Sequence, residues 1–405
     1  MAAVPRIRPW SGPALLSYGF RPFFLLAGIQ AVWTLLVWTA FQLGLVGLPT
    51  AWPAPAWHAH ELLFGYGTAA LAGFLLTAVP NWTGRLPLSG LPLAGLAGLW
   101  ILGRLAVAAA GLLPAPAVAL ATLLFPASLL LVTGREVAAG RNRRNCPVIG
   151  LVALLLVAQL AFHLELAAES PAPVAAHAAI ALFLLLILLI GGRIVPSFTT
   201  NWLRHHRPGA PLPAPFDRLD AAALALAALA LALLLAARIA PLPPALPGLV
   251  ACLAGLAHLF RLARWRPFAT LPEPLLWVLH LAYFFVPLGF LAAGFGHGLD
   301  SPGLLLASTH IWTVGAIGLM TLAVMTRATR GHTGRALHAP PETAAAYLAL
   351  AAAAIFRAAA ALLPEASPVL VPTAGLLWLL AFAIFLAAYA PMLLAPRVPA
   401  GSPAC

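Results

Sequence analysis

The sequence contains few charged residues. Of its 405 residues, 22 are basic and 10 are acidic, so charged side chains make up 8% of the chain. In soluble proteins about a quarter of the residues are charged. Lysine is absent, and every basic residue is an arginine. This composition excludes a water-soluble globule and a disordered chain.

Cysteine is also scarce. Cys146, Cys252 and Cys405 lie far apart and form no CxxC pair. Neither a disulfide framework nor a zinc or iron–sulfur site is therefore indicated. Residues 1–10 precede no short apolar segment with a cleavage site, so no removable signal peptide is predicted.

Apolar residues predominate in this sequence. Hydrophobic residues make up 62% of the chain, and the mean hydropathy is +0.98. Because a membrane span needs about 20 apolar residues, the breaks at Pro, Gly and Arg predict twelve transmembrane helices. They are expected near 23–47, 57–79, 90–112, 115–134, 146–168, 173–195, 219–238, 244–262, 274–295, 302–326, 342–363 and 368–394. The predicted fold is an all-α membrane protein with one twelve-helix domain (23–394), an N-terminal segment (1–22) and a C-terminal tail (395–405).

The arginines predict how the chain is oriented in the bilayer. Nineteen of them fall in the N-terminal segment, in every second connection and in the tail, whereas the other connections hold only Arg238. By the positive-inside rule both termini are cytoplasmic. Since the net charge of +12 comes from short loops between apolar runs, the expected partner is the lipid bilayer and not nucleic acid.

Histidines are the candidates for chemistry. In the predicted topology five histidines from four spans occupy one outer band, namely His58, His60, His163, His177 and His310, and His280 lies in the inner half. Neutral imidazole is a good ligand for haem iron and copper, and a bundle holds its ligands rigidly. The candidate metal ligands are His58, His60, His177, His280 and His310.

Less specialised roles remain open for these residues. His58 and His60 could anchor an aromatic belt, and His177 and His310 could form hydrogen bonds between helices. Residues i and i+2 differ by about 200° around a helix, so His58 and His60 should face different ways. Glu61, His163 and Glu165 are candidates for proton transfer. Alternatively, Glu61 stabilises the positive end of its helix, and His163 with Glu165 forms a solvated helix end.

A weak internal repeat accompanies these histidines. His60 precedes Arg85 by 25 residues, and His310 precedes Arg335 by the same spacing. His177 leads to Val195-Pro196 and Asn201-Trp202, as His60 leads to Val79-Pro80 and Asn81-Trp82. Three pseudo-repeats of four helices are expected, and repeats are common in membrane folds.

Long motifs around these positions resemble one known family. They are Trp57-His58-Ala59-His60-Glu61, the run from Ala72 to Arg85, the run from Gly191 to Thr199, the run from Gly315 to Arg327, and Gly331-His332-Thr333-Gly334-Arg335. From about residue 17 to 394 the chain resembles the NnrS family, twelve-span bacterial membrane proteins of the nitric oxide response. Leu62 stands where the family usually has methionine, so no thioether ligand is expected there.

The resemblance implies cofactors and a location. It implies b-type haem and copper in the bacterial inner membrane, a link to denitrification and nitrosative stress, and contact with nitric oxide or a derived species and with a redox donor. In that setting four arginines at inner helix ends become candidates for pairing with haem propionates, with fixing orientation as their alternative role. They are Arg85, Arg193, Arg327 and Arg335.

Several activities remain compatible with this sequence. Haem–copper oxidases and nitric oxide reductases also carry ligand histidines on the second, sixth and tenth helices, which leaves a nitric oxide-related oxidoreductase open. The seventh predicted span has no histidine, unlike those enzymes. The main alternative is a secondary transporter that exports a nitrosylated iron or thiol species. A sensor or assembly factor ranks last, because no soluble segment exceeds the 196–218 loop.

Overall fold

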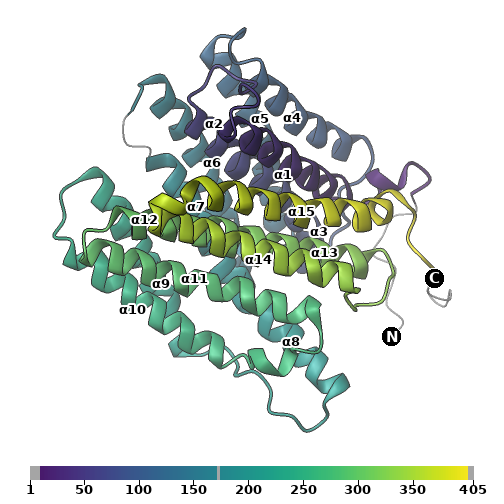
Figure 1. The fold of residues 1–405 in the computed structure, drawn as a ribbon. Coiled ribbons are helices and arrows are strands. Elements are labelled where there is room, and N and C mark those ends of the chain that lie inside the picture. Colours follow the sequence, from purple (N-terminus) through teal and green to yellow (C-terminus); the bar gives the residue numbers. More distant parts are fainter. Residues whose placement is uncertain (1–9, 171–173, 400–405) are drawn as a thin grey trace. The chain divides into compact units, whose positions relative to one another are not determined.

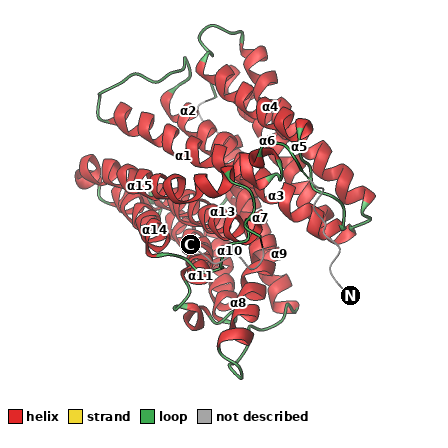
Figure 2. Ribbon diagram, turned by 90° about the vertical axis from the view of Figure 1, so that its right-hand side faces the viewer, coloured by secondary structure: helices red, strands yellow, loops and turns green. Residues whose placement is uncertain are grey.

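The computed structural model describes residues 10–170 and 174–399 (Figure 1). Within these residues all regular elements are helices and none is a strand (Figure 2), which confirms the all-α fold. The α-helices are α1 (Phe20–Gln42), α2 (Ala54–His60), α3 (Thr68–Thr83), α4 (Leu91–Ala108), α5 (Ala115–Ala139), α6 (Cys146–Ala167), α7 (Val174–Leu186), α8 (Gly192–His206), α9 (Arg218–Ile239), α10 (Ala245–Ala263), α11 (Pro274–Gly298), α12 (Pro302–His310), α13 (Leu319–His332), α14 (Pro341–Leu362) and α15 (Ser367–Leu394).

Among the described residues, twelve continuous helical stretches are long and apolar enough to cross a membrane, as predicted. The largest difference from prediction is the sixth span, which runs through Val174–His206 and does not end near 195. Pro196 lies inside α8. A proline inside an α-helix clashes with the carbonyl of the residue four positions earlier. For Pro196 that residue is Gly192, which directly follows the π segment Ile187–Gly191, where the α-helical hydrogen bonds are already interrupted. The helix can therefore continue through Pro196.

The structure describes only part of the predicted N-terminal segment and of the predicted tail. Residues 1–9 of the predicted N-terminal segment lie outside the described residues, as do residues 400–405 of the predicted tail, which include Cys405. The cytoplasmic position of both termini stays a prediction from the arginine distribution.

In the part of the chain that the structure describes, three spans contain a π-helical segment. Glu61–Gly67 joins α2 to α3, Ile187–Gly191 joins α7 to α8, and Ile311–Gly318 joins α12 to α13. These are the second, sixth and tenth spans, the ones that the sequence predicts to carry related positions of three repeats. The repeat itself stays a prediction. Because π-helical turns are frequent at functional sites, these segments direct attention to the side chains beside them.

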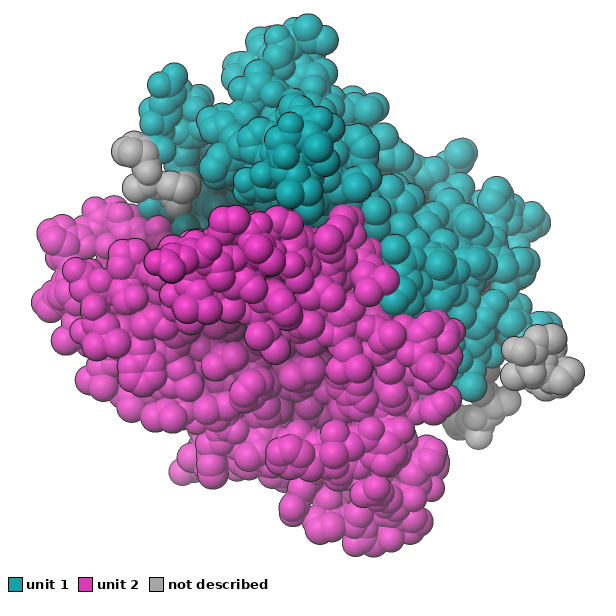
Figure 3. All heavy atoms as spheres, viewed as in Figure 1, with its two compact units in different colours: residues 1–179, 324–337, 382–405 teal, residues 180–323, 338–381 magenta. Residues whose placement is uncertain are grey.

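The spans form two compact units, coloured separately in Figure 3. The first comprises residues 1–179, 324–337 and 382–405, and therefore α1 to α6 with the beginning of α7. The second comprises residues 180–323 and 338–381, which include α8 to α12 and α14. His58, His60 and His177 belong to the first unit, whereas His280 and His310 belong to the second.

Small residues bring α10 and α11 together in the second unit. A Cβ on Gly294 would lie 2.8 Å from the backbone oxygen of Gly248 and closer still to the Sγ of Cys252. Both distances are shorter than real Cβ contacts, so only glycine fits. Helix interfaces in membranes depend on such small residues because no hydrophobic effect drives the helices together.

Replacing Gly294 with alanine should therefore destabilise this helix pair. We expect Gly294→Ala to cost about 1–3 kcal/mol, the usual range for overpacking, seen as a lower unfolding midpoint of the purified protein in detergent. A Cβ on Gly298, at the end of the same helix, would meet no atom within 4 Å, so Gly298→Ala is the matched control. Equal midpoints for the two variants would contradict the close approach.

Candidate metal site

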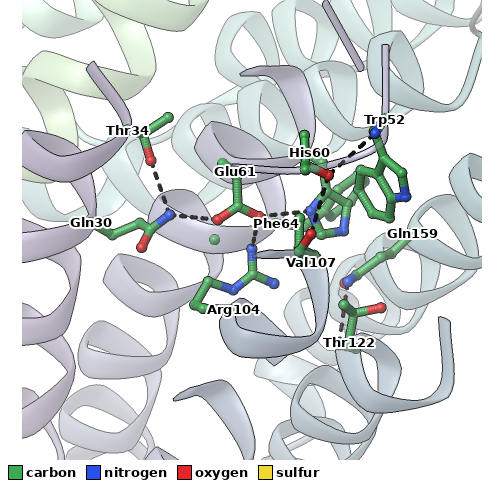
Figure 4. A network of polar contacts seen from close by, with 12 residues as sticks. Gln30, Thr34, Trp52, His60, Glu61, Phe64, Arg104, Val107, Thr122 and Gln159 are labelled. Atoms are coloured by element: carbon green, nitrogen blue, oxygen red, sulfur yellow. Dashed lines mark hydrogen bonds and ion pairs between the residues drawn. The ribbon is translucent and has the colours of Figure 1, made fainter. Parts of the chain in front are cut away.

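A buried carboxylate organises the interior of the first unit. Glu61, at the start of the first π segment, is 4% exposed. Its Oε2 accepts a hydrogen bond of 2.8 Å from Nε2 of Gln30 in α1, and its Oε1 pairs with the guanidinium of Arg104 in α4. Gln30 also donates to Thr34 Oγ1 at 2.9 Å. Figure 4 shows these groups meeting around the carboxylate. An acid buried in a span needs such compensation.

The π segment makes room for this pairing. A Cβ on Gly65 would lie 3.0 Å from Nη1 of Arg104 and 3.2 Å from Nε2 of Gln30, so glycine lets both side chains pass. The backbone oxygen of Gly65 accepts a hydrogen bond of 3.1 Å from the indole of Trp100 in α4. The irregular turn thus exposes a carbonyl that a neighbouring span satisfies.

His60 presents an unpartnered nitrogen to this interior. The side chain is fully buried, and its Nδ1 lies 3.0 Å from Oε1 of Glu61. A carboxylate only accepts hydrogen bonds, so Nδ1 carries the hydrogen and Nε2 is left with a bare lone pair. Among the described residues Nε2 has no hydrogen-bond partner. An imidazole held by a carboxylate with its other nitrogen free is the arrangement typical of metal ligands.

His163 in α6 lies beside His60 with its own tautomer fixed. The two ring centres are 5.4 Å apart. Nε2 of His163 lies 2.7 Å from Oγ1 of Thr122 in α5, and that hydroxyl donates its one hydrogen to the backbone oxygen of Ala119 at 2.9 Å. Thr122 must therefore accept from His163. Nε2 carries the hydrogen, which leaves Nδ1 of His163 as an acceptor.

Aromatic rings enclose the two imidazoles. The ring centres of Trp52, Phe64 and Phe162 lie 5.0, 5.4 and 5.4 Å from that of His60, and Trp52 is 5.6 Å from His163. These apolar walls lower the local dielectric, so polar atoms inside them are expensive to leave unpaired.

The other predicted residues of the first unit take different positions. His58 stacks on Trp38 of α1 at 4.2 Å, so His58 and His60 do face different ways, as expected. Glu165 accepts backbone hydrogen bonds of 3.1 and 3.0 Å from Val174 and Ala175 at the start of α7. This places the carboxylate of Glu165 at a helix N-terminus, where negative charge is favourable.

Arg85 lies far from the imidazoles along its own span. It follows α3, pairs with Glu136 of α5 and is largely exposed. The helix between His60 and Arg85 rises about 1.5 Å per residue, so the two residues are roughly 35 Å apart. One haem ligated by His60 could therefore not also reach Arg85.

In the second unit His280 also has a defined tautomer. Its Nε2 lies 2.9 Å from Oγ1 of Thr199 in α8, which itself donates to the backbone oxygen of Val195 at 2.9 Å. Nε2 of His280 therefore donates, and its buried Nδ1 has no hydrogen-bond partner among the described residues. His310 donates from Nδ1 to the backbone oxygen of Leu306 at 3.0 Å. In the neutral form this leaves Nε2 of His310 as the acceptor.

The second unit also contains a closed polar network that the sequence does not predict. Arg261 of α10 donates to Oδ1 of Asp220 at 2.7 Å, to Tyr283 Oη at 2.9 Å and to the backbone oxygen of Leu188 in the second π segment at 3.2 Å. Tyr283 in turn donates to Nδ1 of His258 at 2.8 Å. Each side chain here is paired, so this network holds spans together.

That network continues to the beginning of α9. Asp217 accepts from the backbone nitrogens of Leu219 and Asp220 in a capping box, and Arg264 donates to it. The hydrogen bond from Arg264 is the main reason why the pKa of Asp217 is lowered from 3.8 to about 2.

Arg104 and Gln30 are the residues of the site that the sequence does not predict. Arg104 is visible in the sequence as a charge inside an apolar run, and intramembrane charges mark functional positions. Its partner Glu61 lies 43 residues away, and only the packing of α4 against the first π segment brings the two together. Among the described residues, no three His, Cys, Asp or Glu side chains gather so that they could hold a metal ion.

These observations define a polytopic helical membrane protein with buried ion pairs inside its spans. Residues 14–397, nearly the whole chain, match the family described as NnrS protein, and the chain belongs to that family. It is thus a membrane protein of the nitric oxide response. No curated protein matches the chain.

Removing Arg104 should leave the buried charge of Glu61 uncompensated. We expect Arg104→Met to lower the free energy of unfolding by about 3–5 kcal/mol, the cost of breaking a buried ion pair. The double variant Arg104→Met with Glu61→Gln should regain most of it. Unfolding midpoints in detergent measure both, and a double variant no more stable than the single one would contradict the pairing.

The pKa of Asp217 predicts a pH dependence of stability. Because folding lowers this pKa from 3.8 to about 2, the carboxylate stabilises the fold fully above pH 3.8 and loses that effect as the pH falls to about 2. Asp217→Asn keeps a good N-cap residue but removes the charge. Unfolding midpoints between pH 5 and 2 should fall less for the variant than for the wild type, and parallel curves would contradict the prediction.

Proposed function

We propose that this chain binds haem and copper in the bacterial inner membrane and thereby lowers the toxicity of nitric oxide. The observation that supports the proposal most is His60, whose buried Nε2 lacks a partner while Nδ1 is held by Glu61. An unpaired acceptor in a dry interior costs stability, and a metal ion would compensate that cost.

The donor chemistry of the histidines fits the implied metals. Imidazole suits both iron and copper. His60 and His310 keep Nε2 as the acceptor, since Nδ1 of each is engaged by a carboxylate or a backbone carbonyl. His177 of the sixth span is a further candidate ligand in this proposal, and so is Nδ1 of His280. When bound, such metals supply coordination positions for nitric oxide and one-electron chemistry.

The chain's own residues give the proposed site its other properties. Phe64, Phe162 and Trp52 pack around the imidazole of His60 and lower the local dielectric. Glu61 and His163 would accept or deliver protons from the same interior if nitric oxide is turned over with an external redox donor. Arg193, Arg327 and Arg335 remain the candidate partners of haem propionates.

Export of a nitrosylated iron or thiol species is the second candidate. It is favoured by the π segments that interrupt three spans, two of them beside buried ion pairs, since transporters build their sites from interrupted helices.

The decisive experiment is an optical spectrum and a metal analysis of the purified protein. We expect a Soret band and copper in the wild type, and loss of one or both in His60→Ala, His177→Ala and His310→Ala. His206→Ala, in an exposed position at the end of α8, is the control. Cells carrying the ligand variants should survive nitric oxide less well than cells with the control.

Two results would overturn this proposal. Protein without a Soret band or copper, combined with full protection by all three ligand variants, would remove the metal from the function. Uptake of a nitrosylated substrate against its gradient by vesicles that hold metal-free protein would favour the transporter.

A further inference from the structure

Arginines from three helix ends lie together at one end of the first unit. Arg21 is in the first turn of α1, Arg330 is in the last turn of α13 with Arg335 just beyond it, and Arg397 follows α15. The charge of Arg330 repels that of Arg335, and the charge of Arg335 repels that of Arg21. Like charges held so close need a reason to stay together.

No acid balances this arginine cluster. Asp and Glu are absent from residues 1–60, 324–341 and 366–405 of the sequence, which include every segment of the cluster. Among the described residues none of the four arginines forms an ion pair. The cluster therefore has four positive charges and no negative one.

A helix-ending motif fixes the backbone at Arg335. Gly334 has a φ of +81°, which glycine adopts without steric cost. Its N–H donates to the backbone oxygen of Gly331 at 3.4 Å, and the N–H of Arg335 donates to that of Arg330 at 3.0 Å. These are the two hydrogen bonds of a Schellman motif. Nε of Arg330 also donates to the backbone oxygen of Ala336 at 2.8 Å, so both arginines are held at one turn.

The segment after α15 packs directly on this turn. The N–H of Val398 donates to the backbone oxygen of Thr333 at 3.0 Å. A Cβ on Gly334 would lie 2.5 Å from the backbone oxygen of Val398 and 3.4 Å from Cγ of Arg397. Glycine thus permits the close approach that brings Arg397 beside Arg335.

The four arginines differ in how far they are satisfied. Arg21 is 3% exposed, and its Nη1 donates to the backbone oxygens of Leu393 and Ala395 at 2.8 and 2.6 Å. A cation is favourable at such a helix C-terminus. Nη1 of Arg335, in contrast, is buried and has no hydrogen-bond partner among the described residues. A buried charged donor without a partner is costly, and an anion on Arg335 would remove that cost.

The position of the cluster indicates which anion it takes. Phe20, His332 and Leu394 are the terminal residues of three membrane spans, so the cluster lies at the level of the lipid headgroups. Exposed apolar side chains flank it: Leu337 is 49% and Leu394 is 52% exposed. A guanidinium binds phosphate oxygens in a bidentate manner, and basic pockets at helix ends bind anionic headgroups. Arginines beside exposed leucines fit a phospholipid better than a soluble phosphate.

A second Thr-Gly-Arg turn in the same unit shows the paired alternative. Thr83-Gly84-Arg85 follows the same course at the end of α3, where Gly84 has a φ of +73° and donates to the backbone oxygen of Pro80 at 2.9 Å. There the arginine pairs with Glu136 of α5. Arg85 is therefore the matched control for Arg335, which has no such acid.

We infer that Arg335, with Arg21, Arg330 and Arg397 around it, forms a binding site for the phosphate of an anionic phospholipid. Nη1 of Arg335 donates to a phosphate oxygen, and the other three arginines contribute positive charge. The bound lipid joins the ends of three spans. This site is independent of the proposed metals, and it leaves Arg193 and Arg327 as the candidate partners of haem propionates.

The test titrates delipidated protein in detergent with phosphatidylglycerol and counts the bound lipids by native mass spectrometry. We expect one tightly bound phosphatidylglycerol per protein and weaker binding of zwitterionic phosphatidylcholine. Arg335→Gln should weaken phosphatidylglycerol binding by about 10-fold or more, the usual effect of losing a hydrogen bond to a charged group. Arg335→Lys keeps the charge but not the fork and should lie in between. Arg85→Gln should change the affinity little.

Measurements on the wild type give an answer that does not depend on the folding of any variant. Phosphatidylglycerol should raise the unfolding midpoint in detergent, because it binds the folded protein, and inorganic phosphate at the same concentration should not replace it. Equal affinity for phosphatidylcholine, full displacement by inorganic phosphate, or unchanged phosphatidylglycerol binding by folded Arg335→Gln protein would overturn the inference.

Haem content separates this site from the proposed function. Arg335→Gln should keep the Soret band of the wild type, and loss of that band in the variant would assign Arg335 to a haem propionate and not to a lipid. Wild-type protein that is isolated without haem and copper, and whose ligand variants protect cells fully, contradicts only the proposed function.

Discussion

The ion pair between Glu61 and Arg104 is the interaction on which the interior of the first unit depends. It neutralises an acid that a membrane span could not otherwise keep ionised at acceptable cost. With Gln30 on its second oxygen, the carboxylate has a fixed orientation, and the imidazole of His60 is oriented in turn. A charge pair that contributes little net stability thereby defines which nitrogen faces the interior.

Both units satisfy the carbonyls of their π segments and compensate buried charges in similar ways. Each has a span with a π segment, and each satisfies a carbonyl of that segment with a side chain from another span, Trp100 for Gly65 and Arg261 for Leu188. Each also buries an arginine against an acid. The difference lies in the histidines: His258 uses both ring nitrogens within its network, whereas His60 does not.

The sequence predicts the fold much better than the site. Twelve spans follow from hydropathy and breakers, because a bilayer forces every span to be a long apolar helix. The extension of the sixth span through Pro196 could not be predicted, since it depends on a backbone irregularity that precedes the proline. Arg104 and Glu61 are visible as separate intramembrane charges. Their pairing is set by packing between spans, which no spacing along the chain encodes.

The π segments also change how each long span can respond to mutation. A π turn is an α-helix that has accommodated an extra residue, so Glu61–Gly67 separates the register of α2 from that of α3. Removing a single residue there would restore a regular helix and leave the two halves in their present orientation. A deletion in the regular part of α2 or α3 would instead swivel one half against the other by about 100°, and His60 would leave its aromatic enclosure or Leu75 and Val79 would lose their packing. Single-residue deletions should thus be tolerated better in these three stretches than elsewhere in the same spans.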